Sequence, residues 1–190
     1  MVGVMAKIDR QTDLDDLVIR ARMDADALGQ LYDLYYERIY QFCLSRLFSR
    51  EAAEDVTSTV FLNVAYGIRT FPGRTEQDFR NWLYRIAANH ANACIRKKSR
   101  REQLLAQAAL SMRTSNTDCA DQPDWPTLYQ AILKLKPKHQ TIIILRFFEN
   151  LEFEQIAKII NARPATVRVT LHRILKKLRN HLQTIVEAGR

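Results

Sequence analysis

Apolar residues recur at helical spacing through most of this chain. One amphipathic run starts after residue 24, and a second starts after Ser49, whose hydroxyl is placed to cap a helix N-terminus. The second run holds Val56, Val60 and Phe61 on one face. Only five glycines and five prolines interrupt the sequence, so long helices can form between them. The pattern predicts an all-α protein.

A break at Pro72 and Gly73 precedes a third helix, which Thr75 is placed to cap and which begins near Glu76. One face of this helix is apolar, and the other ends in a basic cluster at residues 96–101. The second face carries a polar stripe of Asn81, Arg85, Asn89, Asn92 and Arg96. Amides pair with base edges and arginines with phosphates, so the stripe indicates a nucleic-acid surface. An ordinary solvated helix face is the alternative.

Aromatic residues surround the break at Pro72 and Gly73. Trp82 lies in an apolar stretch that is typical of a packed core. Phe71 is different, because it falls in the loop and close to Arg74. Aromatic rings beside basic residues can hold unstacked bases of single-stranded DNA. The loop is therefore a hypothetical base-binding pocket.

A composition change divides the chain into two parts. Residues 111–126 are rich in Ser, Thr, Asn, Asp and Pro, as linkers often are. We therefore expect two small helical domains joined by a flexible linker. The predicted boundaries are an N-terminal extension with a short helix at 1–23, a first domain at 24–102, a helix end and linker at 103–126, and a second domain at 127–190.

Residues 151–182 predict a helix-turn-helix of the winged-helix-like class. A short amphipathic run ends at Asn161, and Pro164 suits the start of the next helix because its missing N–H would be unpaired there anyway. This second helix is apolar on one face and basic on the other, as a helix that enters the DNA major groove must be. Its first turns carry Ala165, Thr166, Arg168, Val169 and His172 towards bases, while Arg163, Arg173, Lys176, Lys177 and Arg179 suit phosphates. An amphipathic helix in a plain bundle is the alternative.

Charge and cysteine content narrow the range of possible functions further. The net charge of +8 favours an acidic partner such as a nucleic acid. Cys43, Cys94 and Cys119 are odd in number and widely spaced, so we expect neither a metal site nor a cofactor. The chain lacks a glycine-rich phosphate loop, a nucleophile elbow and a helix-borne histidine pair, which disfavours an enzyme. Without a signal peptide or an apolar segment of membrane-spanning length, we expect a cytoplasmic protein with no membrane insertion.

The two halves together resemble the bacterial sigma-70 family, and within it the two-domain extracytoplasmic-function sigma factors. The resemblance covers almost the whole chain, and the order and spacing of its segments are specific. It implies a factor that binds core RNA polymerase and directs it to promoters without catalysing a reaction itself. The segments that carry it are Leu31–Tyr40, Ala53–Val56, Val60–Leu62, Phe79–Asn89, Leu145–Arg146, Glu154–Ala157, Thr166–Arg168 and Leu171–Arg173.

The resemblance also implies three binding surfaces. Residues for the polymerase clamp are Asp55, Val56, Phe61 and Leu62. Residues for melting and reading the −10 element are Phe71, Arg74, Arg80, Asn81, Arg85, Asn89, Asn92, Arg96 and Lys97. Residues of the recognition helix for the duplex −35 element are Arg163, Ala165, Thr166, Arg168, Val169, His172, Arg173 and Lys176. The second domain would also contact the polymerase flap, the linker would thread through polymerase, and an anti-sigma factor would mask the polymerase-binding faces.

Several positions depart from the family pattern. Thr59 stands where an acidic residue is common, and Asn161 stands at the turn where glycine is usual. Asparagine tolerates the left-handed backbone that such a turn needs. Ala165, Val169 and Thr170 differ from the common residues of the recognition helix, so the resemblance implies no promoter sequence.

Two other functions are compatible with these patterns. One is a conventional helix-turn-helix regulator that binds duplex operator DNA without polymerase. The other is an adaptor that only holds polymerase or a regulator. A nucleic-acid-processing enzyme ranks third, because the sequence offers no motif for it.

Overall fold

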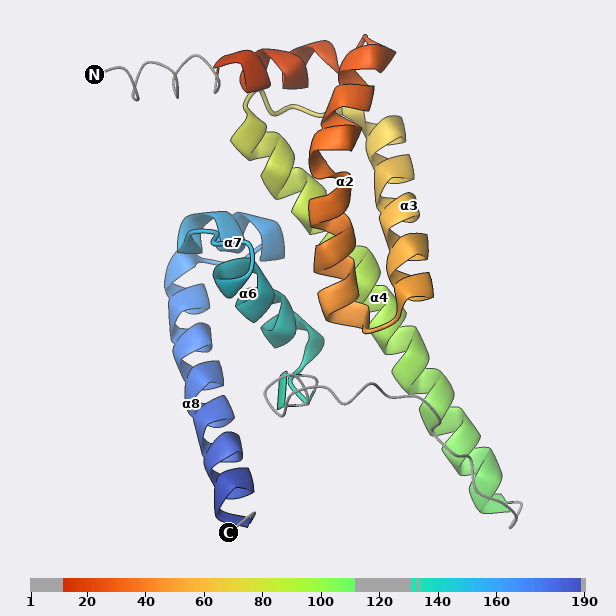
Figure 1. Ribbon diagram of the computed structural model, residues 1–190, viewed down its shortest axis with the longest axis vertical. Coiled ribbons are helices and arrows are strands. Elements are labelled where there is room, and N and C mark those ends of the chain that lie inside the picture. The colour runs from red at the N-terminus through yellow and green to blue at the C-terminus, as the bar shows by residue number, and fades with distance from the viewer. Residues whose placement is uncertain (1–11, 112–130, 133, 189–190) are drawn as a thin grey trace. The chain divides into compact units, whose positions relative to one another are not determined.

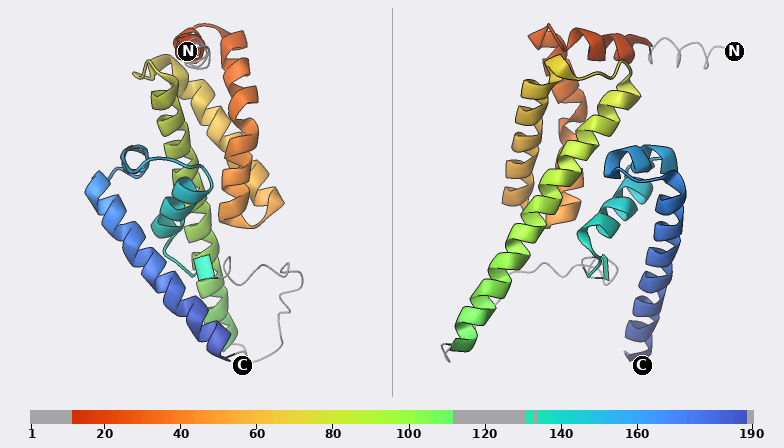
Figure 2. Two further views of the ribbon diagram at one scale, coloured as in Figure 1. Left: turned by 60° about the vertical axis from the view of Figure 1, so that its left-hand side comes forward. Right: turned by 180° about the vertical axis from the view of Figure 1, so that it is seen from behind.

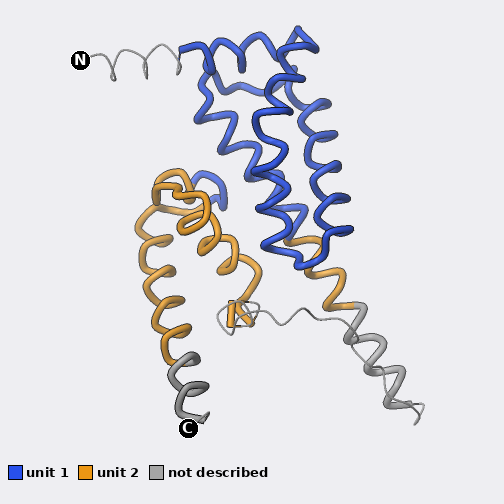
Figure 3. Tube along the Cα trace, viewed as in Figure 1, with its two compact units in different colours: residues 1–91, 158–161 blue, residues 92–157, 162–190 orange. Residues whose placement is uncertain are grey.

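The computed structural model of this chain describes residues 12–111, 131–132 and 134–188 (Figure 1). These residues form helices and no strand, which confirms the predicted all-α class, and the helix-turn-helix has no β-wing within them. The chain divides into two compact units, one of residues 1–91 with 158–161 and the other of residues 92–157 with 162–190 (Figure 3). Residues 112–126 of the predicted linker, with Cys119, lie outside the described residues.

A helical stretch at residues 12–20, three longer helices and a short 3-10 turn build the first unit. The labelled elements are α2 (Ala25–Leu47), α3 (Arg50–Gly67), η1 (Ile68–Thr70) and the first part of α4 (Glu76–Ser111). The Asp24 side chain accepts a hydrogen bond from the backbone N–H of Asp26 and so caps α2. Ser49 accepts from the backbone N–H of Ala52 at 3.3 Å, which confirms the predicted cap of α3.

The core of the first unit lies where α2 and α3 pack beside the start of α4 (Figure 2). The rings of Tyr35 and Phe79 meet edge to face with centroids 5.5 Å apart, and those of Phe42 and Tyr84 do the same at 5.5 Å. Such edge-to-face pairs add to the stabilisation that burial of the rings supplies. Two aromatic pairs therefore join α2 to α4.

The second unit contains α6 (Pro137–Phe147), most of α7 (Phe153–Ile160) and α8 (Pro164–Ala188). Pro164 begins α8, as the sequence predicted. Asn161 adopts a left-handed backbone with φ of 51°, which confirms that asparagine takes the place of glycine at this turn. Leu145, Ile156 and Val167, one from each helix, are fully buried and form the core of this unit.

Candidate nucleic-acid and polymerase interfaces

The loop of residues 71–75 connects η1 to α4, and its aromatic residue points inward. Phe71 is 7% exposed, and its ring stacks on Trp82 with centroids 4.7 Å apart and an interplanar angle of 21°. The expectation that Phe71 holds a base does not fit this placement, because Trp82 already occupies the stacking position. The physical reason is that Trp82 of α4 lies next to the loop, so both aromatic residues belong to one core cluster.

Gly73 allows this loop to close on itself. A Cβ atom at Gly73 would lie 2.3 Å from the Phe71 ring and 2.6 Å from the Cβ of Asp78. No side chain fits there unless the ring or the first turn of α4 moves. Arg74, the next residue, is exposed, so its guanidinium is accessible for the predicted −10 contact.

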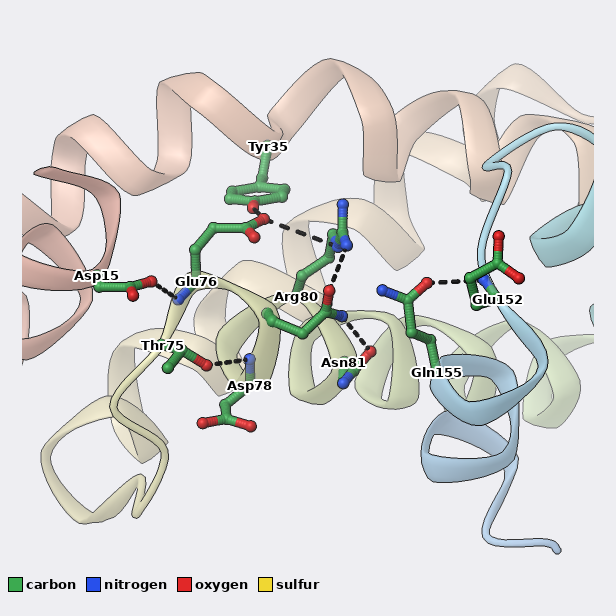
Figure 4. Close-up of polar contacts among 10 residues, drawn as sticks. Asp15, Tyr35, Thr75, Glu76, Asp78, Arg80, Asn81, Glu152 and Gln155 are labelled. Carbon is green, nitrogen blue, oxygen red and sulfur yellow. Dashed lines mark hydrogen bonds and ion pairs between the residues drawn. The ribbon is translucent and has the colours of Figure 1, made fainter. Parts of the chain in front are cut away.

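A polar network surrounds the first turn of α4 (Figure 4). Thr75 accepts a hydrogen bond from the backbone N–H of Asp78 at 3.1 Å, which confirms its predicted role as a cap. Glu76 is buried, accepts a hydrogen bond from the Tyr35 hydroxyl, and lies 3.7 Å from the Nε of Arg80. Burial, and then the bond to Glu76, raise the pKa of Tyr35, so the phenol stays protonated and donates.

Two further residues predicted for the −10 element belong to this network. Arg80 is half-buried and donates to the Gln77 carboxamide oxygen at 2.7 Å. Asn81 is buried, and its side-chain oxygen accepts from the Gln77 amide at 3.1 Å. We expected Asn81 in the polar stripe and Arg80 at the −10 element, but the structure engages both with a neighbouring turn of α4. Buried polar groups need such partners, which a linear pattern does not reveal.

The rest of the predicted stripe is accessible. Arg85 and Asn89 are exposed on α4, and Asn92 is half-buried one turn further on. Arg96 and Lys97 are exposed where the basic cluster begins. These side chains offer donors for phosphates and base edges, and Arg85 also donates to the backbone carbonyl of Lys158. The accessible −10 candidates thus run from Arg74 along α4.

The predicted polymerase-binding residues lie on α3 with mixed exposure. Asp55 is exposed and Leu62 is 54% exposed, whereas Val56 and Phe61 are buried. The hydroxyl of Thr59 donates to the backbone carbonyl of Asp55 at 2.8 Å, so it is turned back on its own helix. Asp55 and Leu62 are therefore the members of this set that a partner can reach directly.

Aromatic residues of α2 extend this surface, and we did not predict this role for them from the sequence. Tyr32 is 43% exposed, and its ring meets Phe61 with centroids 4.7 Å apart. Tyr36 also packs on Phe61, and it stacks on Tyr40. Tyr66 of α3 is 78% exposed. The spacing of Tyr32, Tyr36 and Tyr40 by four residues is the signal that would have found them.

The predicted DNA-facing side of α8 is open to solvent. Val167, Leu171, Ile174 and Leu178 are buried and form the opposite side of the helix. The exposed residues include all those predicted for the −35 element: Arg163, Ala165, Thr166, Arg168, Val169, His172, Arg173 and Lys176. The helix therefore presents donors, positive charge and small apolar groups on one accessible face.

Phe153, at the start of α7, orients one of these residues. The guanidinium of Arg168 lies over the Phe153 ring at 5.1 Å, and that of Arg146 lies over the same ring at 4.9 Å. Arg146 also donates to the backbone carbonyl of Leu151 at 2.9 Å and lies 3.5 Å from the Glu152 carboxylate. Cation–π contact restricts Arg168 while leaving it exposed. No sequence pattern indicated this role for Phe153.

The described residues supply little for other chemistry. Cys43 is buried and Cys94 is half-buried, and neither forms a disulfide. The described side chains contain no group of three or more His, Cys, Asp or Glu that could hold a metal ion. None of the described helices is long and apolar enough to cross a lipid bilayer. The sites of interest are thus the charged and aromatic surfaces.

Comparison with known proteins shows the family of this chain. The family model for Sigma-70 region 2 matches residues 31–101, and that for Sigma-70, region 4 matches residues 127–178. The ECF RNA polymerase sigma factor SigW of Bacillus subtilis is 32% identical over 174 residues, which cover 85% of this chain and 92% of SigW. The chain belongs to the ECF sigma factors. The region 2 match covers most of α2, all of α3 and the first part of α4, and the region 4 match covers α6, α7 and part of α8.

Further relatives agree with this membership of the ECF sigma factors. The RNA polymerase sigma factor YlaC of Bacillus subtilis is 31% identical over 165 residues, covering 83% of this chain and 92% of YlaC. The ECF RNA polymerase sigma-E factor of Haemophilus influenzae is 30% identical over 176 residues, covering 86% and 91% of the two chains.

Solved structures share the fold of this ECF sigma factor. CnrH, solved in complex with the cytosolic domain of CnrY, superposes with a TM-score of 0.68 at 19% identity and covers 90% of this chain and 97% of CnrH. RpoE of Bartonella quintana, solved with the anti-sigma factor NepR, gives a TM-score of 0.61 at 18% identity, covering 82% and 96%. Both likenesses support the two-domain helical architecture.

Proposed function

We propose that this chain binds core RNA polymerase and directs it to promoters by reading two DNA elements in different states. The exposed face of α8 reads a duplex −35 element, and the loop of residues 71–75 with α4 captures a melted −10 element. The observation that carries the proposal is the accessible basic face of α8 in a chain that belongs to the ECF sigma factors.

Duplex recognition suits the construction of α8. The buried face anchors the helix, and the exposed face places Arg168 and His172 near its start, where recognition helices meet base edges. Arg168 can donate two parallel hydrogen bonds to a guanine. Arg173 and Lys176 lie further along the exposed face, where phosphate contacts hold the helix in register.

Capture of a melted strand suits the loop and the open part of α4. Exposing a base from the stack costs a few kcal/mol, which contacts to the separated strand must offset. Arg74, Arg85 and Asn89 are exposed and can supply such contacts. We assign Arg80 and Asn81 a supporting role, because the Arg80 guanidinium contacts Glu76 and Gln77 and the side-chain oxygen of Asn81 accepts from Gln77.

Polymerase binding suits the aromatic surface of α2 and α3. Tyr32 on α2 and Leu62 and Tyr66 on α3 expose apolar groups, and α3 also exposes the carboxylate of Asp55. Exposed apolar clusters of this kind are typical of protein interfaces. We propose that this face docks on the polymerase clamp, that the second domain contacts the flap, and that an anti-sigma factor masks these faces in the cytoplasm. The polymerase performs the chemistry, so we assign no reaction to this chain.

Reconstituted transcription tests the proposal. The full chain would be combined with core polymerase and a library of randomised promoters, and the transcripts would be sequenced. We expect transcripts that require this chain and whose promoters share two elements at fixed spacing. Tight binding to a duplex operator without polymerase, and no dependent transcripts, would instead establish a conventional regulator. Polymerase binding without promoter-specific transcripts would establish an adaptor.

A further inference from the structure

Residues 12–23, which we call the N-terminal segment, pack against the rest of the first unit. Residues 12–20 are helical and are followed by a turn. Leu17, Val18 and Ala21 are buried, which indicates that this helix packs through one apolar face. The segment lies outside the residues matched by the region 2 model, which begin at residue 31. The segment also makes polar contacts, which its apolar packing does not require.

Two polar side chains of the segment reach the loop of residues 71–75 and the start of α4. Asp15 accepts a hydrogen bond from the backbone N–H of Glu76 at 2.6 Å. Arg22 donates to the backbone carbonyl of Gly73. These contacts lie on either side of Arg74, the exposed residue that we assign to the melted strand. The segment thus holds the backbone both before and after the proposed DNA contact.

The contact of Asp15 adds to the capping of α4. The first backbone N–H groups of a helix lack partners within the helix. Thr75 accepts from the N–H of Asp78, and Asp15 accepts from the N–H of Glu76. A carboxylate at this end also interacts favourably with the helix dipole. The start of α4 is therefore fixed partly by a side chain sixty-one residues away in the sequence.

The contact of Arg22 is made at Gly73, where the loop is closely packed. The Nε of Arg22 is buried and has no hydrogen-bond partner among the described residues, so this guanidinium is partly withdrawn from water. Arg22 contacts the loop through the hydrogen bond that it donates to the Gly73 carbonyl. Gly73 lies against the Phe71 ring and Asp78, where no Cβ atom fits. The backbone at this point has little freedom while Arg22 stays in place.

We infer that the N-terminal segment is a positioning element for strand capture, in which Asp15 and Arg22 hold the loop of residues 71–75 in the conformation that receives the melted −10 strand. The inference rests on the proposed function. Ordering a free loop on binding reduces affinity, whereas a loop held in advance avoids that loss. Asp15 and Arg22 act through the loop and do not touch DNA themselves.

A double variant with a matched control tests this role. Asp15→Ala with Arg22→Ala removes both contacts. Asp16→Ala with Arg20→Ala removes one aspartate and one arginine from the same helix, where they form an exposed ion pair at 2.9 Å. Both variants have the same composition change and the same net charge, so a difference between them reports the contacts to the loop.

The measurements are made on reconstituted holoenzyme with the full chain. One probe is a single-stranded oligonucleotide that carries the non-template −10 region of a promoter recovered from the library. The second is a duplex −35 oligonucleotide, and the third assay is competition for core polymerase. We expect the Asp15 and Arg22 double variant to bind the single strand about tenfold more weakly, as loss of two hydrogen bonds suggests. Its duplex and polymerase binding, and all three readouts of the control, should match wild type.

Conservative variants separate positioning from folding. Asp15→Asn keeps an acceptor oxygen and Arg22→Lys keeps a donor, so we expect most of the strand affinity to return. Unchanged strand binding by the alanine double variant would overturn the inference. Equal losses in all three assays, with a lower unfolding temperature, would overturn it too, because the contacts would then serve only stability. A wild-type holoenzyme that binds −10 and scrambled strands equally would instead refute the proposed function, and the inference with it.

Discussion

The two candidate DNA-binding surfaces of this sigma factor are built in different ways. On α8, the residues predicted for the −35 element are all exposed, and a separate apolar face anchors the helix. At the start of α4, Phe71 and Asn81 are buried, and Arg80 pairs with Glu76. A duplex has a groove that a rigid helix can enter, whereas a melted strand has to be held by a shaped loop. The difference indicates that strand capture needs internal support as well as contacts.

Truncation of Phe71 should give the largest effect. It tests whether the strand-capture surface depends on internal packing. Phe71→Ala removes a buried ring that stacks on Trp82, so we expect the free energy of unfolding of the first unit to fall by about 3–5 kcal/mol. Chemical denaturation followed by Trp fluorescence measures this. The exposed Arg74→Ala serves as the control and should leave stability within about 0.5 kcal/mol of wild type. A fully stable Phe71→Ala with weakened strand binding would place the ring against DNA instead.

Predictability from sequence also differs between the two surfaces. On α8, the buried residues Val167, Leu171 and Ile174 recur with the period of an α-helix. The exposed face of α8 could therefore be predicted from this spacing. On α4, the same reasoning placed Asn81 on an open stripe although it is buried. The environment of this helix start depends on Asp15 and Tyr35, which are distant in sequence. Local periodicity carries no information about those neighbours.

The helix caps show the part of the first unit that local sequence does determine. Ser49 and Thr75 were predicted as caps and accept the expected backbone hydrogen bonds. A cap depends on the two or three residues that follow it, so a short pattern is sufficient. The Phe153 contact with Arg168 is the opposite case, because it joins two helices. The roles of the predicted DNA-binding residues stay predictions.

Arg168 should give the next largest effect. Arg168→Ala is expected to weaken binding of the cognate −35 duplex by about 1–3 kcal/mol, because an exposed arginine near the start of α8 can pair with a guanine. Holoenzyme binding to matched duplexes that differ at one base pair measures the effect position by position. An equal loss on every sequence would make Arg168 a phosphate contact.

Substitution of Phe153 tests whether the −35 surface also has internal support. Phe153→Leu keeps an apolar side chain but removes the aromatic face under Arg168, so we expect the −35 affinity to fall by about 0.5–1 kcal/mol. Combining it with Arg168→Ala gives a double-mutant cycle, in which Phe153→Leu should add no further loss of −35 affinity. Additive losses would show that Phe153 acts independently of Arg168.

The smallest expected effect is a pH dependence of the second unit. Burial, and then the nearby Lys136, Lys177 and Lys138, lower the pKa of His139 below its usual 6.5. The unfolded chain therefore binds this proton more readily, so the contribution of His139 is complete above pH 6.5 and is lost as the pH falls below it. His139→Gln should flatten the fall in unfolding temperature between pH 7 and pH 5. An unchanged slope would assign that fall to other groups.

Divided recognition is tested most directly by measuring two variants on two probes. Holoenzymes with Arg168→Ala or Asn89→Ala would be titrated with a duplex −35 probe and with a single-stranded −10 probe. We predict that Arg168→Ala weakens binding to the duplex alone and that Asn89→Ala weakens binding to the single strand alone. If either variant weakened both probes equally, the two units would not read separate elements and the account would be wrong.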